Sequence, residues 1–286
     1  MTPSITKQYP TITGATSTQQ NQQENPSANS DDGRKVYILG YGSLMHTVAR
    51  QATAPDPKGF ALIPVQIKDR SASWNLVNRG LKMRVLGGEV TPKRSLTGVI
   101  FETTKGSLGD YDKREGRNYK RVNVSLENVK CYVPEHQSLL DEDGIEVFMY
   151  QAVKTDVGNE TEKGGYLLHN PTSQEYKIFR SYLDIVLSGA HEIDERFGLN
   201  GEFCSDYLKG MQTQDLLVRD DRLEPQYSRH PLNLVKNPPA WLQNSMADYM
   251  EHTWPKLQER ANDLFAQMMP PKVTDPKTQE AYQDVA

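Results

Sequence analysis

Along the central part of this sequence, strand-like segments come first and helix-like segments follow them. This order is the feature that most constrains the fold. The predicted helices have apolar residues near the helical period and cover 173–190 and 201–211. The predicted strands are short runs rich in β-branched and aromatic residues, at 35–39, 61–67, 81–86, 96–101, 119–124 and 146–153. Strands followed by helices predict an α+β domain with a mixed β-sheet that closes towards a small barrel, with flanking helices.

The two ends of the chain differ in character from this region. Residues 1–34 are rich in Thr, Ser, Gln, Asn and Pro, and such a segment cannot bury enough apolar surface to offset its ordering entropy. Further along, Pro238 and Pro239 precede two helical patterns, and the second begins at Trp254-Pro255 because proline suits a first helical turn. The sequence therefore predicts a disordered tail, a globular domain, a helical extension and a second disordered tail, at 1–34, 35–230, 231–270 and 271–286.

Charge and composition exclude several classes of partner. The formal net charge is -4, so long-range attraction to nucleic acid is not expected. No apolar stretch resembles a signal peptide or reaches membrane-spanning length, which favours a cytoplasmic protein with no membrane partner. The two cysteines, Cys131 and Cys204, are too few for a disulfide framework and lack zinc-ligand spacing, so both are interpreted as small buried apolar residues. We expect no metal and no cofactor.

The first candidate motif is a glycine-containing loop that directly follows the first strand. Tyr41, Gly42, Ser43 and Leu44 stand where the strand ends, and the glycine lets successive backbone N–H groups converge on a ligand oxygen. Such a nest suits a carboxylate. The same pattern also occurs in purely structural turns, and it lacks the third glycine of a dinucleotide-binding loop. Ser43 is not in a nucleophile elbow, because Leu44 and Met45 follow it.

The second candidate motif is Glu115, which a helix-stopping glycine follows, with a strand beginning at Tyr119. One interpretation is a solvated, charged helix end. The other is a carboxylate held at a junction between elements, facing a cavity. Tyr119 and Tyr150 are candidate pocket walls or ordinary core residues. Trp74 is a further candidate for the edge of the site.

These two motifs, in this order, resemble the γ-glutamylcyclotransferase and AIG2-like superfamily. The segments 95–102 and 146–150 also resemble that family's glycine-containing strand and its tyrosine-ended strand, so the resemblance covers about 35–155 and extends more loosely to about 212. The resemblance implies that Glu115 is the catalytic acid and base. It also implies a substrate-binding set of Tyr41, Gly42, Ser43, Leu44, Tyr119 and Tyr150.

The implied reaction is that of a γ-glutamylcyclotransferase, in which the α-amine of a γ-glutamyl group attacks its own γ-carbonyl. It releases 5-oxoproline and a free amine, as in glutathione metabolism, and needs neither metal nor nucleotide. One alternative is a non-catalytic module that binds a γ-glutamyl group or another carboxylate. Another is an interaction protein whose tails and C-terminal helices bind an unknown protein partner. The leaving amine and the oligomeric state stay open.

Overall fold

The computed structural model describes residues 35–57, 60–78, 80–142, 144–153, 166–167, 175–212, 217–236, 238–240 and 242–268. The predicted tails at 1–34 and 271–286 lie outside this part of the chain. The strands are β1 (Lys35–Gly40), β2 (Leu62–Asn78), β3 (Met83–Thr103), β4 (Tyr119–Asn123), β5 (Val129–Cys131), β6 (Ile145–Ala152), β7 (Tyr166–Leu167), β8 (Lys177–Phe179), β9 (Met211–Gln212) and β10 (Val218–Arg219). The helices are α1 (Thr47–Gln51), α2 (Leu108–Glu115), α3 (Gln137–Leu140), α4 (Arg180–Phe197), α5 (Glu202–Gly210), α6 (Pro231–Lys236), α7 (Gln243–Asp248) and α8 (Trp254–Met268).

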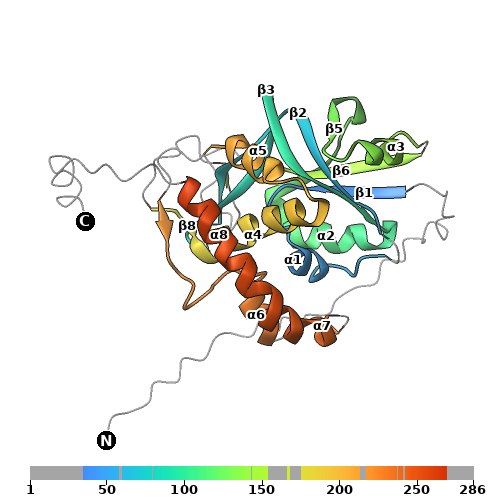
Figure 1. Ribbon diagram of the computed structural model, residues 1–286. Coiled ribbons are helices and arrows are strands. Elements are labelled where there is room, and N and C mark those ends of the chain that lie inside the picture. The colour runs from blue at the N-terminus through green and yellow to red at the C-terminus, as the bar shows by residue number, and fades with distance from the viewer. Residues whose placement is uncertain are drawn as a thin grey trace, which may run out of the picture. The chain divides into compact units, whose positions relative to one another are not determined.

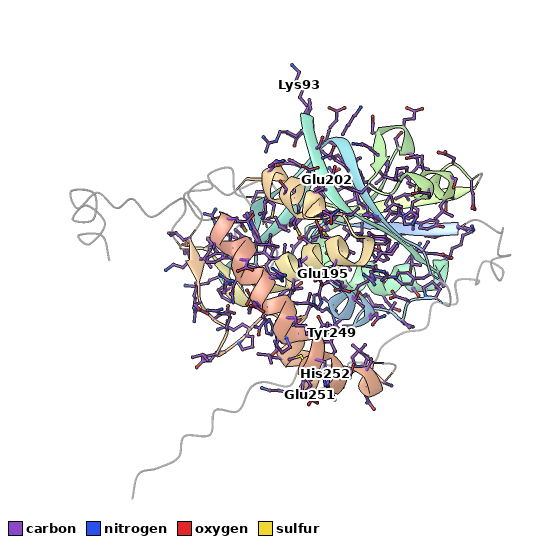
Figure 2. The ribbon with its side chains drawn as sticks, viewed as in Figure 1. Lys93, Glu195, Glu202, Tyr249, Glu251 and His252 are labelled. Carbon is purple, nitrogen blue, oxygen red and sulfur yellow. The ribbon has the colours of Figure 1, made fainter. Side chains whose placement is uncertain are left out.

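The described strands form one mixed sheet around the buried strand β1. β1 pairs antiparallel with β3 and parallel with β6, and β4 continues the sheet beyond β6. β2 and β3 form a long antiparallel hairpin, and Lys93 lies midway along β3, where the pairing with β2 shifts register (Figure 1, Figure 2). β3 also meets β6 where Gly88 pairs with Gln151, so the sheet curls. The predicted α+β class with a mixed sheet is confirmed, and the described strands do not close into a barrel.

The predicted break between strands 81–86 and 96–101 is wrong, because β3 runs without interruption through both. The strand continues because it pairs with β2 along nearly its whole length, with an irregularity opposite Asp69, where Lys93 has φ of 64°. The glycines Gly87 and Gly88 therefore mark a close approach instead of a turn. A Cβ atom on Gly88 would lie 2.8 Å from Cζ of Tyr41.

The predicted start of the first long helix is also wrong. The sequence pattern places it at 173, whereas α4 begins at Arg180. The residues just before it form β8, because Lys177 and Ile178 pair with β3 and Ile178 pairs with Val218 on β10. The N-terminus of α4 is capped by a distant carboxylate, since the backbone N–H of Ser181 donates to Asp221 at 2.8 Å. A residue pattern local to the helix contains no sign of that cap.

Ser107 stands at the N-cap position of α2. Its side chain makes no capping hydrogen bond at the start of α2. Thr104 caps this turn instead, and its hydroxyl accepts a hydrogen bond from the N–H of Ser107 at 3.1 Å. A 3₁₀ turn, Lys105–Ser107, thus precedes the helix.

Helix α4 is the central helix of the fold. It is buried on nearly every side from Arg180 to Ala190, as expected of a helix enclosed by other elements. α8 lies over α4 (Figure 1). Arg180 links the two helices, because its guanidinium stacks on the Phe265 ring at 3.8 Å and donates to Asn262 at 2.7 Å.

The predicted C-terminal helical extension at 231–270 comprises α6, α7, a π-helical turn at Tyr249–Thr253 and α8. The sequence pattern separates two helices here, at 241–252 and 256–268. The structure joins them through the π-helical turn, and α8 begins at Trp254 as predicted. Ala261 and Leu264 of α8 belong to the main hydrophobic core.

Candidate active site

Two close approaches that only glycine permits fix the position of the loop at Tyr41–Leu44. On the strand side, a Cβ atom on Gly98 of β3 would lie 2.5 Å from the carbonyl oxygen of Gly40. On the helix side, a Cβ atom on Gly189 of α4 would lie 2.7 Å from the backbone nitrogen of His46. Both distances are shorter than packed atoms tolerate. The loop is therefore held between β3 and α4 at the point where β1 ends.

Glu115 is the last residue of α2, and a change of backbone direction places it at the site. Gly116 follows with φ of 60°, a left-handed value that favours glycine, and ends the helix. A 3₁₀ turn at Gly116–Asn118 then leads into β4 at Tyr119. The helix end therefore lies next to the sheet, and 15% of the Glu115 side chain is exposed.

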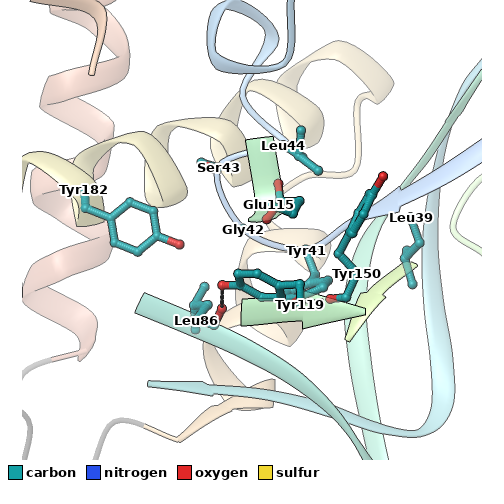
Figure 3. A pocket seen from close by; sticks show the side chains of 10 residues that line it. All are labelled: Leu39, Tyr41, Gly42, Ser43, Leu44, Leu86, Glu115, Tyr119, Tyr150 and Tyr182. Carbon is teal, nitrogen blue, oxygen red and sulfur yellow. Dashed lines mark hydrogen bonds between the residues drawn. The ribbon is translucent and has the colours of Figure 1, made fainter. Parts of the chain in front are cut away.

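One pocket brings together all seven residues that the sequence proposes for the site. The space between its walls, including part open to solvent, is about 330 Å³. Figure 3 shows the Glu115 carboxyl group in the middle of the lining and the Tyr182 hydroxyl directed inwards from α4. The lining residues are Leu39, Tyr41, Gly42, Ser43, Leu44, Leu86, Glu115, Tyr119, Tyr150 and Tyr182. The sequence proposal did not include Leu39, Leu86 and Tyr182.

The Tyr41 side chain is fully engaged in holding the loop against the sheet. Its hydroxyl donates to the Tyr150 carbonyl oxygen at 2.6 Å and accepts from the Gly88 N–H at 3.0 Å. Its own carbonyl oxygen accepts from the Tyr207 hydroxyl at 2.8 Å. Burial, and next the negative charge of Glu115, raise the pKa of Tyr41. Tyr41 therefore stays neutral at physiological pH and positions the loop.

The other two predicted tyrosines, Tyr119 and Tyr150, line the pocket, and their hydroxyl groups are hydrogen-bonded within the protein. The Tyr119 hydroxyl donates to the Leu86 carbonyl oxygen at 2.7 Å (Figure 3). The Tyr150 hydroxyl donates to a carboxylate oxygen of Asp112 at 2.8 Å. Burial raises the pKa of both tyrosines. Their rings therefore shape the pocket while their hydroxyl groups satisfy protein acceptors.

Trp74 does not line the pocket. Its ring packs edge-on against Tyr182 with the centroids 5.8 Å apart, so it supports a pocket residue from behind. Trp74 belongs to β2, which extends further than the 61–67 segment that the sequence predicts. Arg121 also lies outside the lining and forms an ion pair with Asp112 at 3.0 Å.

Arg114 is a buried residue that sequence reasoning missed, and it joins the two motifs. Its Nη2 donates to the Ser43 hydroxyl oxygen at 2.8 Å, and its Nε lies 3.0 Å from a carboxylate oxygen of Glu115. Its Nη1 donates to the Ala49 carbonyl oxygen at 2.6 Å and to the Thr53 hydroxyl at 2.5 Å. Only 5% of the side chain is exposed. One guanidinium thus fixes the loop relative to the carboxylate.

The environment of Glu115 makes its ionised form less favourable than in an ordinary, solvated glutamate. Burial raises its pKa, because the ionised carboxylate loses hydration. The positive charges of Arg114 and Arg229 oppose this shift and do not reverse it. A carboxyl group with a raised pKa exchanges protons more readily near neutral pH than an ordinary glutamate does.

The loop is also held from the C-terminal side through His46. Ala49 N–H donates to Nδ1 of His46 at 3.2 Å, so the proton of the neutral ring lies on Nε2, which is 2.5 Å from the Tyr249 hydroxyl. Figure 2 shows Tyr249 on the C-terminal helical segment. The Trp254 ring packs edge-on against His46 at 5.8 Å and against His230 at 5.5 Å. His46, shortly after the loop, therefore lies against the turn that begins α8.

We expect protonation of His46 to destabilise the folded state. Burial, then Arg50 and His230, lower its pKa to about 3, whereas an unfolded histidine has a value near 6.5. The stabilisation is therefore present above about pH 6.5 and is lost as pH falls towards 3. Between pH 7.5 and pH 5.0 the loss from this residue amounts to about 2 kcal/mol.

The measurement is the free energy of unfolding of the wild type and of His46→Asn by urea at both pH values. Asparagine can still cap α1, so the variant folds. The wild type should lose about 2 kcal/mol more than the variant on acidification. Equal losses in the two proteins would show that His46 is not kept neutral by the fold.

The described residues contain no group of three or more His, Cys, Asp or Glu side chains that could hold a metal ion. Within the same residues, every helix is too short or too polar to cross a membrane.

No protein-family model and no curated protein matches the chain. Similar solved structures include a human one that is described as an uncharacterized protein. It is 16% identical in sequence, the match covers 59% of this chain and 86% of that chain, and the TM-score is 0.38. Another, named gamma-glutamyl cyclotransferase, has 14% identity, the same coverage of 59% and 86%, and a TM-score of 0.38. A yeast structure, named as a gamma-glutamyl cyclotransferase specific to glutathione, has 14% identity, covers 80% of this chain and 98% of that chain, and has a TM-score of 0.30. A functional proposal for this chain therefore rests on its own pocket residues.

Proposed function

We propose that this chain is a γ-glutamyl cyclotransferase, which releases 5-oxoproline and a free amine from a γ-glutamyl amine, amino acid or peptide. The observation that supports this most directly is that Glu115, with its raised pKa, shares one pocket with the loop Tyr41–Leu44. The pocket is small, and its space of about 330 Å³ includes part that is open to solvent. The site thus offers a proton carrier, backbone donors and a small pocket.

The reaction needs no second reactant, and Glu115 can carry its protons. The carboxylate takes a proton from the α-ammonium, and the free amine attacks the γ-carbonyl carbon to form the new C–N bond. The carboxylic acid then gives its proton to the leaving nitrogen as the original amide C–N bond breaks. The regenerated carboxylate removes the remaining extra proton from the ring nitrogen, and this proton leaves with the released amine.

The loop has a separate role in this proposal. Its backbone N–H groups meet the oxygen of the γ-carbonyl as negative charge develops there. Tyr119 and Tyr150 restrict the substrate to a folded conformation, which brings the amine close to the carbonyl carbon. Arg114 holds the loop and Glu115 at a fixed separation, so both groups are in place before the substrate binds.

The test is release of 5-oxoproline by the purified protein from glutathione, γ-glutamyl-alanine and γ-glutamyl-lysine. We expect 5-oxoproline and the free amine in equal amounts from at least one of them. Two matched controls are α-glutamyl-alanine, in which the amide is on the wrong carbonyl, and N-acetyl-γ-glutamyl-alanine, in which the amine is blocked. Folded protein that releases nothing from the panel, or that cleaves the blocked compound equally well, would contradict the proposal.

A further inference from the structure

Arg229 is a partly buried cation near Glu115, and it is not one of the pocket's lining residues. Among the residues that the structure describes, its guanidinium has no hydrogen-bond or ion-pair partner. It interacts electrostatically with both Glu115 and Arg114, so it lies near the proposed catalytic carboxylate. Burial lowers its pKa from an ordinary value of 12.5, which leaves it charged at physiological pH.

The turn that carries Arg229 is fixed to the pocket wall. Two residues earlier, the Tyr227 hydroxyl lies 3.0 Å from the Ser43 hydroxyl, and the Tyr227 ring centroid is 4.6 Å from that of Tyr182. The His230 N–H closes the turn on the Tyr227 carbonyl oxygen at 3.0 Å, and the Asn233 side-chain amide donates to the same oxygen at 2.6 Å. These contacts hold the turn that carries Arg229 against the pocket wall.

The charges around Glu115 indicate which kind of ligand group suits the Arg229 guanidinium. Nε and both Nη atoms of Arg114 are already bonded to Glu115, Ser43, Ala49 and Thr53. Two guanidinium groups therefore interact with one carboxylate, and Arg229 is the one whose donors have no partner among the described residues. A free guanidinium in a partly buried site favours a planar anionic partner, and a carboxylate fits its two parallel donors.

We propose that Arg229 binds the α-carboxylate of the γ-glutamyl group and thereby selects this acyl group over one that lacks the carboxylate. This inference rests on the proposed function. The α-carboxylate and the α-amine are attached to the same carbon atom, so an amine beside Glu115 brings its carboxylate near Arg229. The backbone N–H groups of the loop are then left for the γ-carbonyl oxygen.

The kinetic test pairs two substrates with two proteins. γ-Glutamyl-alanine is compared with 4-aminobutyryl-alanine, which lacks the α-carboxylate and cyclises to 2-pyrrolidinone. We expect the wild type to prefer the glutamyl compound in kcat/KM by about 10- to 100-fold, the worth of a charged hydrogen-bonded contact. Arg229→Gln should lose a similar factor on the glutamyl compound and stay within about 3-fold on the other.

The control variant is Arg222→Gln, which removes a positive charge from the same segment. Arg222 pairs with Asp220 at 2.5 Å on the exposed surface and should leave both rates unchanged. Rates are compared on the plateau of each pH profile, because loss of Arg229 also raises the pKa of Glu115. A variant that slows both substrates equally would overturn the proposal, since Arg229 would then act only through Glu115.

A binding measurement separates this inference from the proposed function. Calorimetric titration with 5-oxoproline needs no turnover, and we expect Arg229→Gln to weaken its binding at least 10-fold relative to the wild type. Binding of 2-pyrrolidinone should be the same in both proteins. The wild type could release no 5-oxoproline while Arg229→Gln still weakens binding of 5-oxoproline and not of 2-pyrrolidinone. That result would contradict the cyclotransferase activity and support Arg229 as a carboxylate-binding residue. Unchanged 5-oxoproline binding in the variant would overturn the role of Arg229 whether or not the wild type is active.

Discussion

Glu115→Gln is expected to lower kcat for 5-oxoproline release by about 1,000-fold, the usual scale for loss of a positioned acid and base. Glutamine has nearly the same shape and cannot take a proton from the α-ammonium or return one to the leaving nitrogen. KM should change much less, because the amide still fills the position of the carboxyl group in the pocket. The measurement is steady-state release of 5-oxoproline at saturating substrate.

The fold should survive this substitution. Because burial raises the pKa of Glu115 in the folded state, burying the ionised carboxylate opposes folding at neutral pH, and a neutral amide removes that cost. Asp110→Asn is a matched control on the same helix, since Asp110 is exposed and its ion-pair partner among the described residues is the exposed Lys113. Full activity in Glu115→Gln with an unchanged melting temperature would show that another group moves the protons.

The pH dependence of the wild type follows from the same environment. Activity requires the Glu115 carboxylate, so kcat/KM should rise with pH and level off above the raised pKa of this group. Its positive neighbours Arg114 and Arg229 lower that pKa. Removal of either charge therefore moves the rising limb to higher pH, and this shift distinguishes an electrostatic effect from loss of substrate contacts.

The sequence predicted those parts of the site whose signals are local. The loop directly follows a strand, and Glu115 directly precedes a helix-ending glycine, so neighbouring residues indicate both positions. Tyr119 starts the strand that follows. In the structure these residues line one pocket, because β1, β4 and β6 are adjacent in the sheet. Their chemical roles stay predictions until the variants are measured.

The residues that sequence reasoning missed are those placed by contacts between distant segments. Tyr182 enters the pocket from α4, and Tyr227 and Arg229 come from the segment before α6. No spacing rule links these positions to the loop. Arg114 could have been noticed, because it is next to Glu115 in the last turn of α2, but a charged helix end is usually solvated. Its burial depends on α1, whose backbone it contacts.

The difference between local signals and long-range contacts also accounts for the errors in the predicted fold. Gly87 and Gly88 suggest a turn when only neighbours along the chain are considered. They are extended because β3 pairs with β2 and because Tyr41 occupies the space beside Gly88. Long-range pairing therefore overrides a local breaker signal, whereas the helix-ending signal at Gly116 has no such competitor and is correct.

Arg114→Met is expected to have the largest effect on stability, lowering the free energy of unfolding by about 3–5 kcal/mol, the cost of breaking a buried ion pair by removing one partner. Methionine keeps much of the apolar volume. It leaves the Ala49 carbonyl oxygen and the Glu115 carboxylate without the donors that now reach them. Urea unfolding at pH 7.5 measures the loss, and 5-oxoproline release measures its effect on the site.

Two further variants show whether stability depends on the several N–H donors of the Arg114 guanidinium or on its positive charge alone. Arg114→Lys keeps the charge but cannot reach Glu115, Ser43 and Ala49 together, so its stability should lie between those of the wild type and Arg114→Met. Lys113→Met removes an exposed positive charge from the same helix, whose surface ion pair with Asp110 contributes little, and should change the free energy of unfolding by less than about 0.5 kcal/mol. If lysine at position 114 restored full stability and activity, a single positive charge would suffice to hold the loop and Glu115 in place. If Arg114→Met were as stable as Lys113→Met, the two motifs would be held together by the β1, β3 and α4 contacts alone.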